Sequence, residues 1–269
     1  MHKNNKQFSG CWGIVLGGSS GFGLAAIEKL ASHGMNIAVL YRETAAAERT
    51  LKQKLTKLAA ENDITITPHN INALDGAART TLIEQLAATI PAHSIKLLLH
   101  SIARGNLKPL VVIDGGAHEE LSIHDIQLTT YAMSTSLLDW AKGLLKADLF
   151  HADARIIGLT SEGSDKYWEG YAAVSIAKSS LESLTTYMAV ELSKYGLKTN
   201  LIQAGITATP SLKRIPDSER LIQTAIKRNP FGRITQPQDV ANVIYLLCTD
   251  EAAWINGTVI HVDGGEHCR

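Results

Sequence analysis

The chain has 269 residues, and its 26 basic and 26 acidic side chains give a formal net charge of zero at neutral pH. A balanced charge does not favour a protein that binds nucleic acid or a membrane surface, so we expect neither partner. Three cysteines, Cys11, Cys248 and Cys268, lie far apart and form no Cys-x-x-Cys pair. This usage suits a reducing compartment better than a disulfide scaffold or a zinc site.

The first ten residues are polar and lack the apolar core of a secretion signal. No apolar run approaches the roughly 18 residues of a membrane span. We therefore expect a cytoplasmic protein with a polar tail at residues 1–10 and one domain at residues 11–269.

Short apolar runs alternate with longer helical patterns over nearly the whole chain. Such alternation predicts an α/β protein: a single Rossmann-type doubly wound domain with a seven-stranded parallel sheet, whose crossovers are right-handed. The expected strands are 12–16, 36–41, 64–67, 95–100, 154–159, 199–202 and 258–262. The expected helices are 24–32, 45–60, 82–88, 128–145, 176–192 and 239–248, the last with Thr235 as its cap. Residues 204–233 lack clear strand character and predict a loop with a helix over the site.

A glycine-rich turn joins the first expected strand to the first expected helix. Such a turn exposes backbone N–H groups and the positive end of the helix dipole to a pyrophosphate. Glycine turns also join strands to helices without binding anything, so the spacing gains its weight from the rest of the chain. We assign to a dinucleotide site the residues Gly17, Ser19, Ser20, Gly21, Phe22 and Gly23.

The end of the second expected strand indicates which dinucleotide binds, because the adenosine ribose is contacted there. Arg42 offers a planar, permanently charged fork for a 2′-phosphate, which favours NADPH over NADH. Glu43 could instead pair with Arg42 or accept a hydrogen bond from the ribose of NAD. After the third strand, Asn70 and Ile71 could flank the adenine, although a turn asparagine has the same appearance.

The glycine turn, the helix that carries Lys178 and the terminal segment 257–265 together resemble the short-chain dehydrogenase/reductase superfamily. The usual Tyr-x3-Lys pair of that superfamily is absent, because Val174 stands four positions before Lys178. Tyr171 instead precedes Lys178 by seven positions, and this Tyr-x6-Lys arrangement resembles the enoyl-acyl-carrier-protein reductases. Ser161 stands where many members carry a second tyrosine, as in an NADPH-using bacterial subgroup.

The same resemblance implies further site residues. Tyr171, Lys178 and Ser161 would be catalytic, with Lys178 also holding the nicotinamide ribose and Ser161 orienting the substrate or Tyr171. Segments after the fourth and sixth strands would surround the cofactor. The residues implied there are Ser101, Ile102, Ala103, Thr207 and Thr209. The family also suggests a homotetramer built through the fourth and fifth helices.

The displaced tyrosine has a chemical reason. A ketone reductase adds hydride to the carbon that carries the oxygen, whereas an enoyl thioester accepts hydride at its β-carbon while charge accumulates on the distant thioester oxygen. Seven residues are close to two helical turns, so Tyr171 and Lys178 can face one cleft. The favoured function is NAD(P)H-dependent reduction of the carbon–carbon double bond of an enoyl thioester, in fatty-acid or related lipid or polyketide biosynthesis.

Two other functions remain open: a carbonyl reductase with a displaced tyrosine, and a nucleotide-binding regulatory protein without turnover. Between positions 207 and 233 stand six basic and two acidic residues. This excess suits an acidic acyl carrier protein or the phosphates of coenzyme A, or it is a solvated helix face. His100, directly after a buried strand, suggests a structural hydrogen bond. His118, Glu119 and His124 lack metal-ligand spacing, so we assign no metal.

Overall fold

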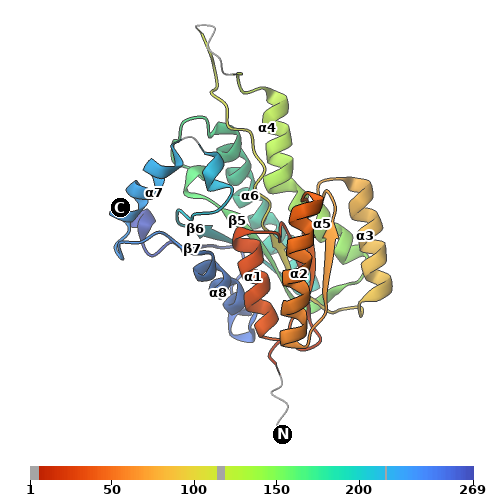
Figure 1. Ribbon diagram of the computed structural model, residues 1–269. Coiled ribbons are helices and arrows are strands. Elements are labelled where there is room, and N and C mark those ends of the chain that lie inside the picture. The colour runs from red at the N-terminus through yellow and green to blue at the C-terminus, as the bar shows by residue number, and fades with distance from the viewer. Residues whose placement is uncertain (1–5, 114–118, 216) are drawn as a thin grey trace.

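The computed structural model describes residues 6–113, 119–215 and 217–269. Seven parallel strands form one sheet in the order β3-β2-β1-β4-β5-β6-β7. The doubly wound fold expected from the sequence is therefore confirmed (Figure 1). The strands are β1 Trp12–Leu16, β2 Asn36–Tyr41, β3 Ile66–Asn70, β4 Ile95–His100, β5 Phe150–Thr160, β6 Leu197–Ala204 and β7 Val259–Val262.

Helices cover both faces of this sheet (Figure 1). Apolar side chains of α1, α2 and α8 pack in one buried cluster, and those of α3, α5 and α6 pack in the cluster on the opposite face. Among the described residues, no helix is long and apolar enough to cross a membrane. The α-helices are α1 Gly21–Ser32, α2 Ala45–Asn62, α3 Gly76–Thr89, α4 Ile123–Thr130, α5 Ser136–Lys146, α6 Ala172–Glu191, α7 Ser218–Arg228 and α8 Pro237–Cys248.

Several expected boundaries differ from the structure. The expected strand 64–67 is shifted to β3, which tolerates Pro68 because it is an edge strand. The expected helix 128–145 lies within α4 and α5, which a π-helical turn at Tyr131–Thr135 joins. Thr235 is not the cap of α8. Its backbone N–H instead donates to the Ile206 carbonyl, and Gln236 caps the helix.

The domain begins earlier than residue 11. Phe8, inside the expected polar tail, is buried and packs edge-on against Tyr245 of α8, with 5.8 Å between ring centroids. Its backbone N–H donates to the His33 carbonyl. A single aromatic side chain therefore anchors the segment before β1, which its polar composition had hidden.

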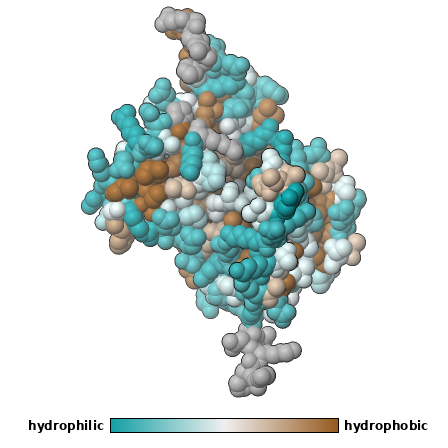
Figure 2. Space-filling model, in the orientation of Figure 1, coloured by the Kyte–Doolittle hydropathy of each residue, from teal (hydrophilic) through white to brown (hydrophobic). Residues whose placement is uncertain are grey.

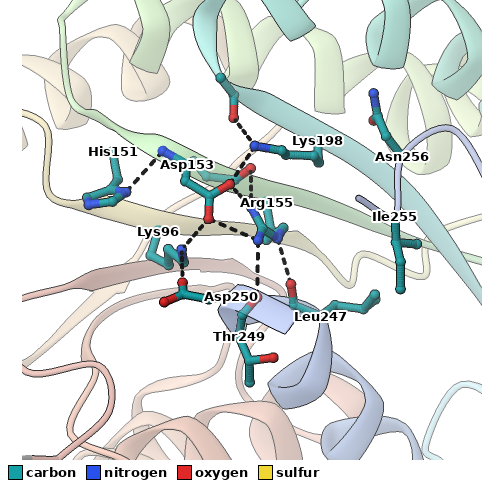
Figure 3. Close-up of polar contacts among 12 residues, drawn as sticks. Lys96, His151, Asp153, Arg155, Lys198, Leu247, Thr249, Asp250, Ile255 and Asn256 are labelled. Atoms are coloured by element: carbon teal, nitrogen blue, oxygen red, sulfur yellow. Dashed lines mark hydrogen bonds and ion pairs between the residues drawn. The ribbon is translucent and has the colours of Figure 1, made fainter. Parts of the chain in front are cut away.

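A partly buried ionic network, in which Lys96 and Arg155 are buried, lies at the amino ends of the central strands (Figure 3). The Asp153 carboxylate of β5 accepts hydrogen bonds from Lys96 of β4, Lys198 of β6 and its own neighbour Arg155. Arg155 is 1% exposed and also donates to two carbonyls at the end of α8. These charges are far from the carboxyl ends of the strands, where ligands bind in open α/β sheets.

The surface over α1, α2 and α8 is mostly hydrophilic, with a hydrophobic patch toward the side where α7 and the C-terminus lie (Figures 1 and 2). The helix α7 begins after a 3₁₀ turn at Leu212–Arg214, inside the segment 204–233 expected to be a loop with a helix.

Candidate active site

The glycine turn after β1 lies against the chain that leaves β4. Gly17 has φ +88°, and a Cβ there would stand 2.5 Å from the Ser101 carbonyl oxygen. A Cβ on Gly23 would stand 2.2 Å from the Gly17 carbonyl oxygen. The Ser101 N–H donates to the Leu16 carbonyl across 2.8 Å, which fixes this approach. Only glycine fits at these two positions, and the backbone of the turn is left accessible.

The start of α1 differs from the starts of the next three helices. Thr44, Asp75 and Ser122 each cap their helix by accepting a hydrogen bond from its first turn. Ser20, the N-cap of α1, makes no such side-chain bond. The first-turn N–H groups of a helix have no partner within it, so this helix start fits an anionic group such as a dinucleotide pyrophosphate.

The segment after β6 also contacts the glycine turn. A Cβ on Gly21 would contact the Thr209 methyl group at 3.4 Å. Thr207 is buried, and it forms a parallel bridge with Thr235. The sequence-predicted residues Gly17, Gly21, Ser101 and Thr209 therefore meet at the carboxyl edge of the sheet.

The adenosine end of the expected site is arranged differently. Arg42 is exposed. Among the described residues it forms no ion pair, so the alternative in which it pairs with Glu43 is not observed. The Asn70 amide donates to the Glu43 carbonyl and to Glu48, and its oxygen accepts from the Glu43 N–H at 3.0 Å. Asn70 thus holds the turn after β2, while Ile71 packs against the core.

Tyr171, Lys178 and Ser161 come from two adjacent elements. Tyr171 is the N-cap residue of α6, Lys178 lies two turns further along that helix, and Ser161 follows β5. Burial raises the pKa of the Tyr171 phenol, and its interaction with the Ser161 side chain partly offsets this. The phenol therefore stays protonated at neutral pH and can donate a hydrogen bond.

Lys178 is buried, and its ammonium group donates to the Leu159 carbonyl at 2.7 Å. Burial lowers the pKa of Lys178 to about 8, although the nearby Glu182 carboxylate acts in the opposite direction. His100 lies close enough for the Lys178 charge to contribute to its low pKa of about 3, which is mainly due to burial. His100 bonds to the Ser136 hydroxyl at 2.9 Å, which confirms its expected structural role.

The position that carries tyrosine in ketone reductases is apolar here. Val174 is 4% exposed and belongs to a small buried cluster with Ala132, Met133 and Ala177. Leu107 and Tyr171 pack against the same cluster. No phenol can therefore act from the position four residues before Lys178.

Glu162 and Arg228 form an ion pair that the sequence analysis did not identify. The Glu162 carboxylate accepts hydrogen bonds from both terminal nitrogens of Arg228, at 2.5 and 3.1 Å. This ion pair connects the end of α7 to the residue after Ser161. Arg228 also donates to the carbonyl of Glu266 near the C-terminus. Glu162 and Arg228 are 66 positions apart, so no local sequence pattern could predict their contact.

A parallel sheet with a glycine turn after β1 and a helix that carries Tyr171 and Lys178 defines a nicotinamide-dependent oxidoreductase of the short-chain dehydrogenase/reductase type. The family model described as "Enoyl-(Acyl carrier protein) reductase" matches residues 17–267. The chain therefore belongs to that family, as the resemblance of its motifs predicted.

Individual relatives are distant. The enoyl-[acyl-carrier-protein] reductase [NADH] FabI of Aquifex aeolicus is 31% identical over 177 residues, which cover 65% of this chain and 63% of the relative. The 3-oxoacyl-[acyl-carrier-protein] reductase FabG of Escherichia coli is 26% identical over 259 residues, covering 96% of this chain and 98% of the relative.

Solved structures share the fold. The Bacillus cereus enoyl-acyl carrier protein reductase with NADP+ and indole naphthyridinone superposes with a TM-score of 0.82 at 23% identity, covering 98% of this chain and 99% of that one. The Aquifex aeolicus structure has a TM-score of 0.80 at 24% identity, covering 98% of each chain.

Proposed function

We propose that the protein reduces the carbon–carbon double bond of an enoyl thioester. The observation that carries this proposal is the placement of the Tyr171 phenol beside Ser161 at the start of α6, together with the buried Val174 at the ketone-reductase position. A donor displaced along the helix suits an oxygen that is remote from the carbon receiving hydride.

In this proposal the reduced nicotinamide supplies the hydride when bound. Tyr171 donates a hydrogen bond to the thioester oxygen as enolate charge develops, which is the electrostatic stabilisation that preorganised donors provide. Lys178, still mostly charged at neutral pH, binds the ribose hydroxyls and favours ionisation of the phenol. Ser161 orients Tyr171, and the pair of Glu162 with Arg228 positions α7 beside them.

We propose NADPH as the preferred cofactor because the exposed Arg42 lies at the end of β2, where a 2′-phosphate would be bound. Arg42→Ala should weaken NADPH binding by about tenfold, as expected for one charge-assisted contact, and leave NADH binding nearly unchanged. Dissociation constants for both cofactors, measured by fluorescence titration, test this. Equal losses for the two, or a wild-type preference for NADH, would move the ribose contact to Glu43.

An acyl carrier protein is the proposed carrier of the substrate. Of the six basic residues between positions 207 and 233, Arg228 pairs with Glu162 and Arg233 pairs with Asp239, so these two charges are already neutralised. Lys213, Arg220 and Lys227 are exposed and remain for an acidic partner. A homotetramer through the expected fourth and fifth helices, 128–145 and 176–192, which correspond to α4 with α5 and to α6, also belongs to the proposal.

The deciding experiment supplies crotonyl and acetoacetyl thioesters with NADPH and identifies the products by mass spectrometry. We expect the saturated acyl product and essentially no 3-hydroxyacyl product. Tyr171→Phe should lower kcat by about a hundredfold, the loss typical of one such donor, with cofactor binding unchanged. Tyr187→Phe, on the exposed far end of α6, is the matched control.

A carbonyl reductase is the second candidate, and the similarity to the FabG of Escherichia coli supports it. Preferential formation of the 3-hydroxyacyl product would establish this activity instead. An inactive protein that still binds NADPH would point to a regulatory role.

A further inference from the structure

The last turn of the chain brings two histidines together. After β7, Gly264 and Gly265 have φ of +63° and +81°, and they reverse the chain into a 3₁₀ turn at Glu266–Cys268. His267 thereby lies on His261, with ring centroids 3.9 Å apart and the ring planes 18° from parallel. This segment lies at the C-terminus, beside β7 and α7 (Figure 1).

Asp263 fixes the orientation of His267. Its Oδ2 accepts from the His267 backbone N–H at 2.9 Å and lies 2.5 Å from His267 Nδ1, while Oδ1 accepts from the Gly265 N–H. The carboxylate therefore holds the proton on Nδ1 and leaves the Nε2 lone pair free, which is the usual arrangement behind a metal-binding imidazole.

Cys268 supplies a second ligand beside that nitrogen. Its Sγ lies 3.5 Å from His267 Nε2. Two ligands of one tetrahedral zinc ion, with Zn–N near 2.05 Å and Zn–S near 2.3 Å, stand about 3.5 Å apart. The spacing already present is thus the spacing that a shared ion requires.

His261 supplies a third nitrogen. The ligand atoms of His261, Asp263 and His267 all lie within 4.8 Å of one another. The stacked imidazoles must splay apart to share an ion, and His261 is exposed, so its ring can rotate without disturbing the core.

We propose that His261, His267 Nε2 and Cys268 Sγ form a site for Zn²⁺, with Asp263 as the acceptor that orients His267. Two imidazoles and a thiolate favour zinc over oxygen-preferring cations such as Mg²⁺. The fourth position is open to water. The sequence gives no sign of this site, because His261 and His267 meet only after the chain reverses at Gly264.

Asp263 and His267 line a small pocket together with Ser161 and Glu162, so the turn that carries the proposed zinc site also borders the proposed active site. The buried Glu266 accepts from the Ile206 N–H through its carboxylate, and its carbonyl accepts from Arg228. A bound ion would therefore fasten the last turn to β7 and stabilise the support of α7.

The test uses the full chain without a polyhistidine tag, reduced and stripped of metal with a chelator. Titration with Zn²⁺ in competition with a chromophoric chelator should show one equivalent bound per chain. His267→Ala and Cys268→Ser should each weaken binding by at least about tenfold, and Asp263→Asn by about 10- to 100-fold, as for other residues behind a metal ligand. Excess Mg²⁺ should not compete.

The matched controls are His124→Ala and Cys11→Ser, which remove the same functional groups elsewhere and should bind Zn²⁺ as the wild type does. Co²⁺ provides a direct signature, because a thiolate ligand gives an intense near-ultraviolet charge-transfer band. That band should vanish in Cys268→Ser and persist in Cys11→Ser. Zn²⁺ should also raise the Tm of the wild type and leave that of His267→Ala unchanged.

The proposal is overturned if no equivalent of Zn²⁺ binds, or if His267→Ala binds it as tightly as the wild type. A cobalt complex of the wild type without the charge-transfer band would also overturn it. These readouts do not depend on which thioester the enzyme reduces, so the proposed function can fail while the zinc site stands, and the reverse.

Discussion

The two edges of the sheet treat buried charge in opposite ways. At the amino edge, three cations pair with the Asp153 carboxylate, Lys96 also lies 3.7 Å from Asp250, and the guanidinium of Arg155 donates to backbone carbonyls as well (Figure 3). At the carboxyl edge, the buried ammonium of Lys178 has one carbonyl acceptor, and its pKa falls to about 8. A fully paired group supports the fold, whereas an incompletely paired buried group costs stability, and we propose that Lys178 is retained because the cofactor ribose completes its hydrogen bonds.

The amino edge should give the largest effect on stability. Asp153→Asn leaves the buried Arg155 without its carboxylate and Lys96 with only the more distant Asp250, and removing one partner of such a network costs about 3–5 kcal/mol. Hydrogen bonds from the three cations hold the pKa of Asp153 well below its usual value despite the opposing effect of burial. The loss should therefore be complete above about pH 4 and shrink below it, because Asp153 of the unfolded wild-type chain then binds a proton that the folded chain does not.

Urea unfolding of both proteins between pH 2 and pH 7 measures this difference. The rate per folded molecule should stay near that of the wild type, because the network is remote from the active site. If Asp153→Asn were as stable as the wild type, the amino-edge network would not support the fold, and the two edges would not differ in their contribution to stability.

At the carboxyl edge, removing a buried charge should increase the stability of the protein. Lys178→Met removes an incompletely paired buried charge, so it should stabilise the protein at pH 7 by up to about 2 kcal/mol while abolishing turnover. The folded pKa of Lys178, about 8, is below its ordinary value of 10.5. The unfolded wild-type chain therefore binds more protons between these values, and wild-type stability should rise with pH through this window.

Thermal unfolding of both proteins at pH 7 and pH 10 checks this prediction. The gap between them should narrow at the higher pH. If Lys178→Met were less stable than the wild type at pH 7, the lysine would contribute to folding as the amino-edge cations do.

The smallest effect belongs to the ion pair between α7 and the segment after β5. Arg228→Lys keeps the charge but loses the two-pronged contact with Glu162, so the position of α7 should relax. Because the pair is partly exposed, stability should change by less than about 1 kcal/mol. The KM for the thioester should rise about fivefold, equivalent to about 1 kcal/mol of binding, with kcat nearly unchanged.

Arg233→Lys is the matched control, since Arg233 makes an equally two-pronged contact with Asp239 at the start of α8. Steady-state kinetics on the two variants should separate them. Equal KM values would show that the pair with Glu162 has no part in positioning the substrate.

The strands and helices could be predicted because their signals are local. Apolar runs such as Trp12–Leu16 and Ile95–His100 match the structure to the residue. The errors arose where a distant contact decides a boundary. Phe8 is ordered by Tyr245, and Thr235 is recruited by the segment after β6.

The candidate site divides in the same way. Motifs contained within a few residues, namely the glycine turn and the seven-residue step from Tyr171 to Lys178, could be identified from the sequence. The hydrogen bond of Asn70 could not be predicted, because its partner Glu48 lies in the first turn of α2. The Asn70 amide, which suggested an adenine contact, is bonded to Glu48 and to the turn before α2.

The same long-range character at Arg155 has a consequence for synthesis of the chain. Its guanidinium donates hydrogen bonds to the carbonyls of Leu247 and Thr249, which follow 92 and 94 residues later in the chain. The strands β1 to β4, by contrast, pair within the first 100 residues. During translation, one half of the sheet can assemble while Arg155 of the other half has Asp153 but lacks its two acceptors at the end of α8. A chain that stops before Leu247 therefore leaves two hydrogen bonds of a buried guanidinium unmade.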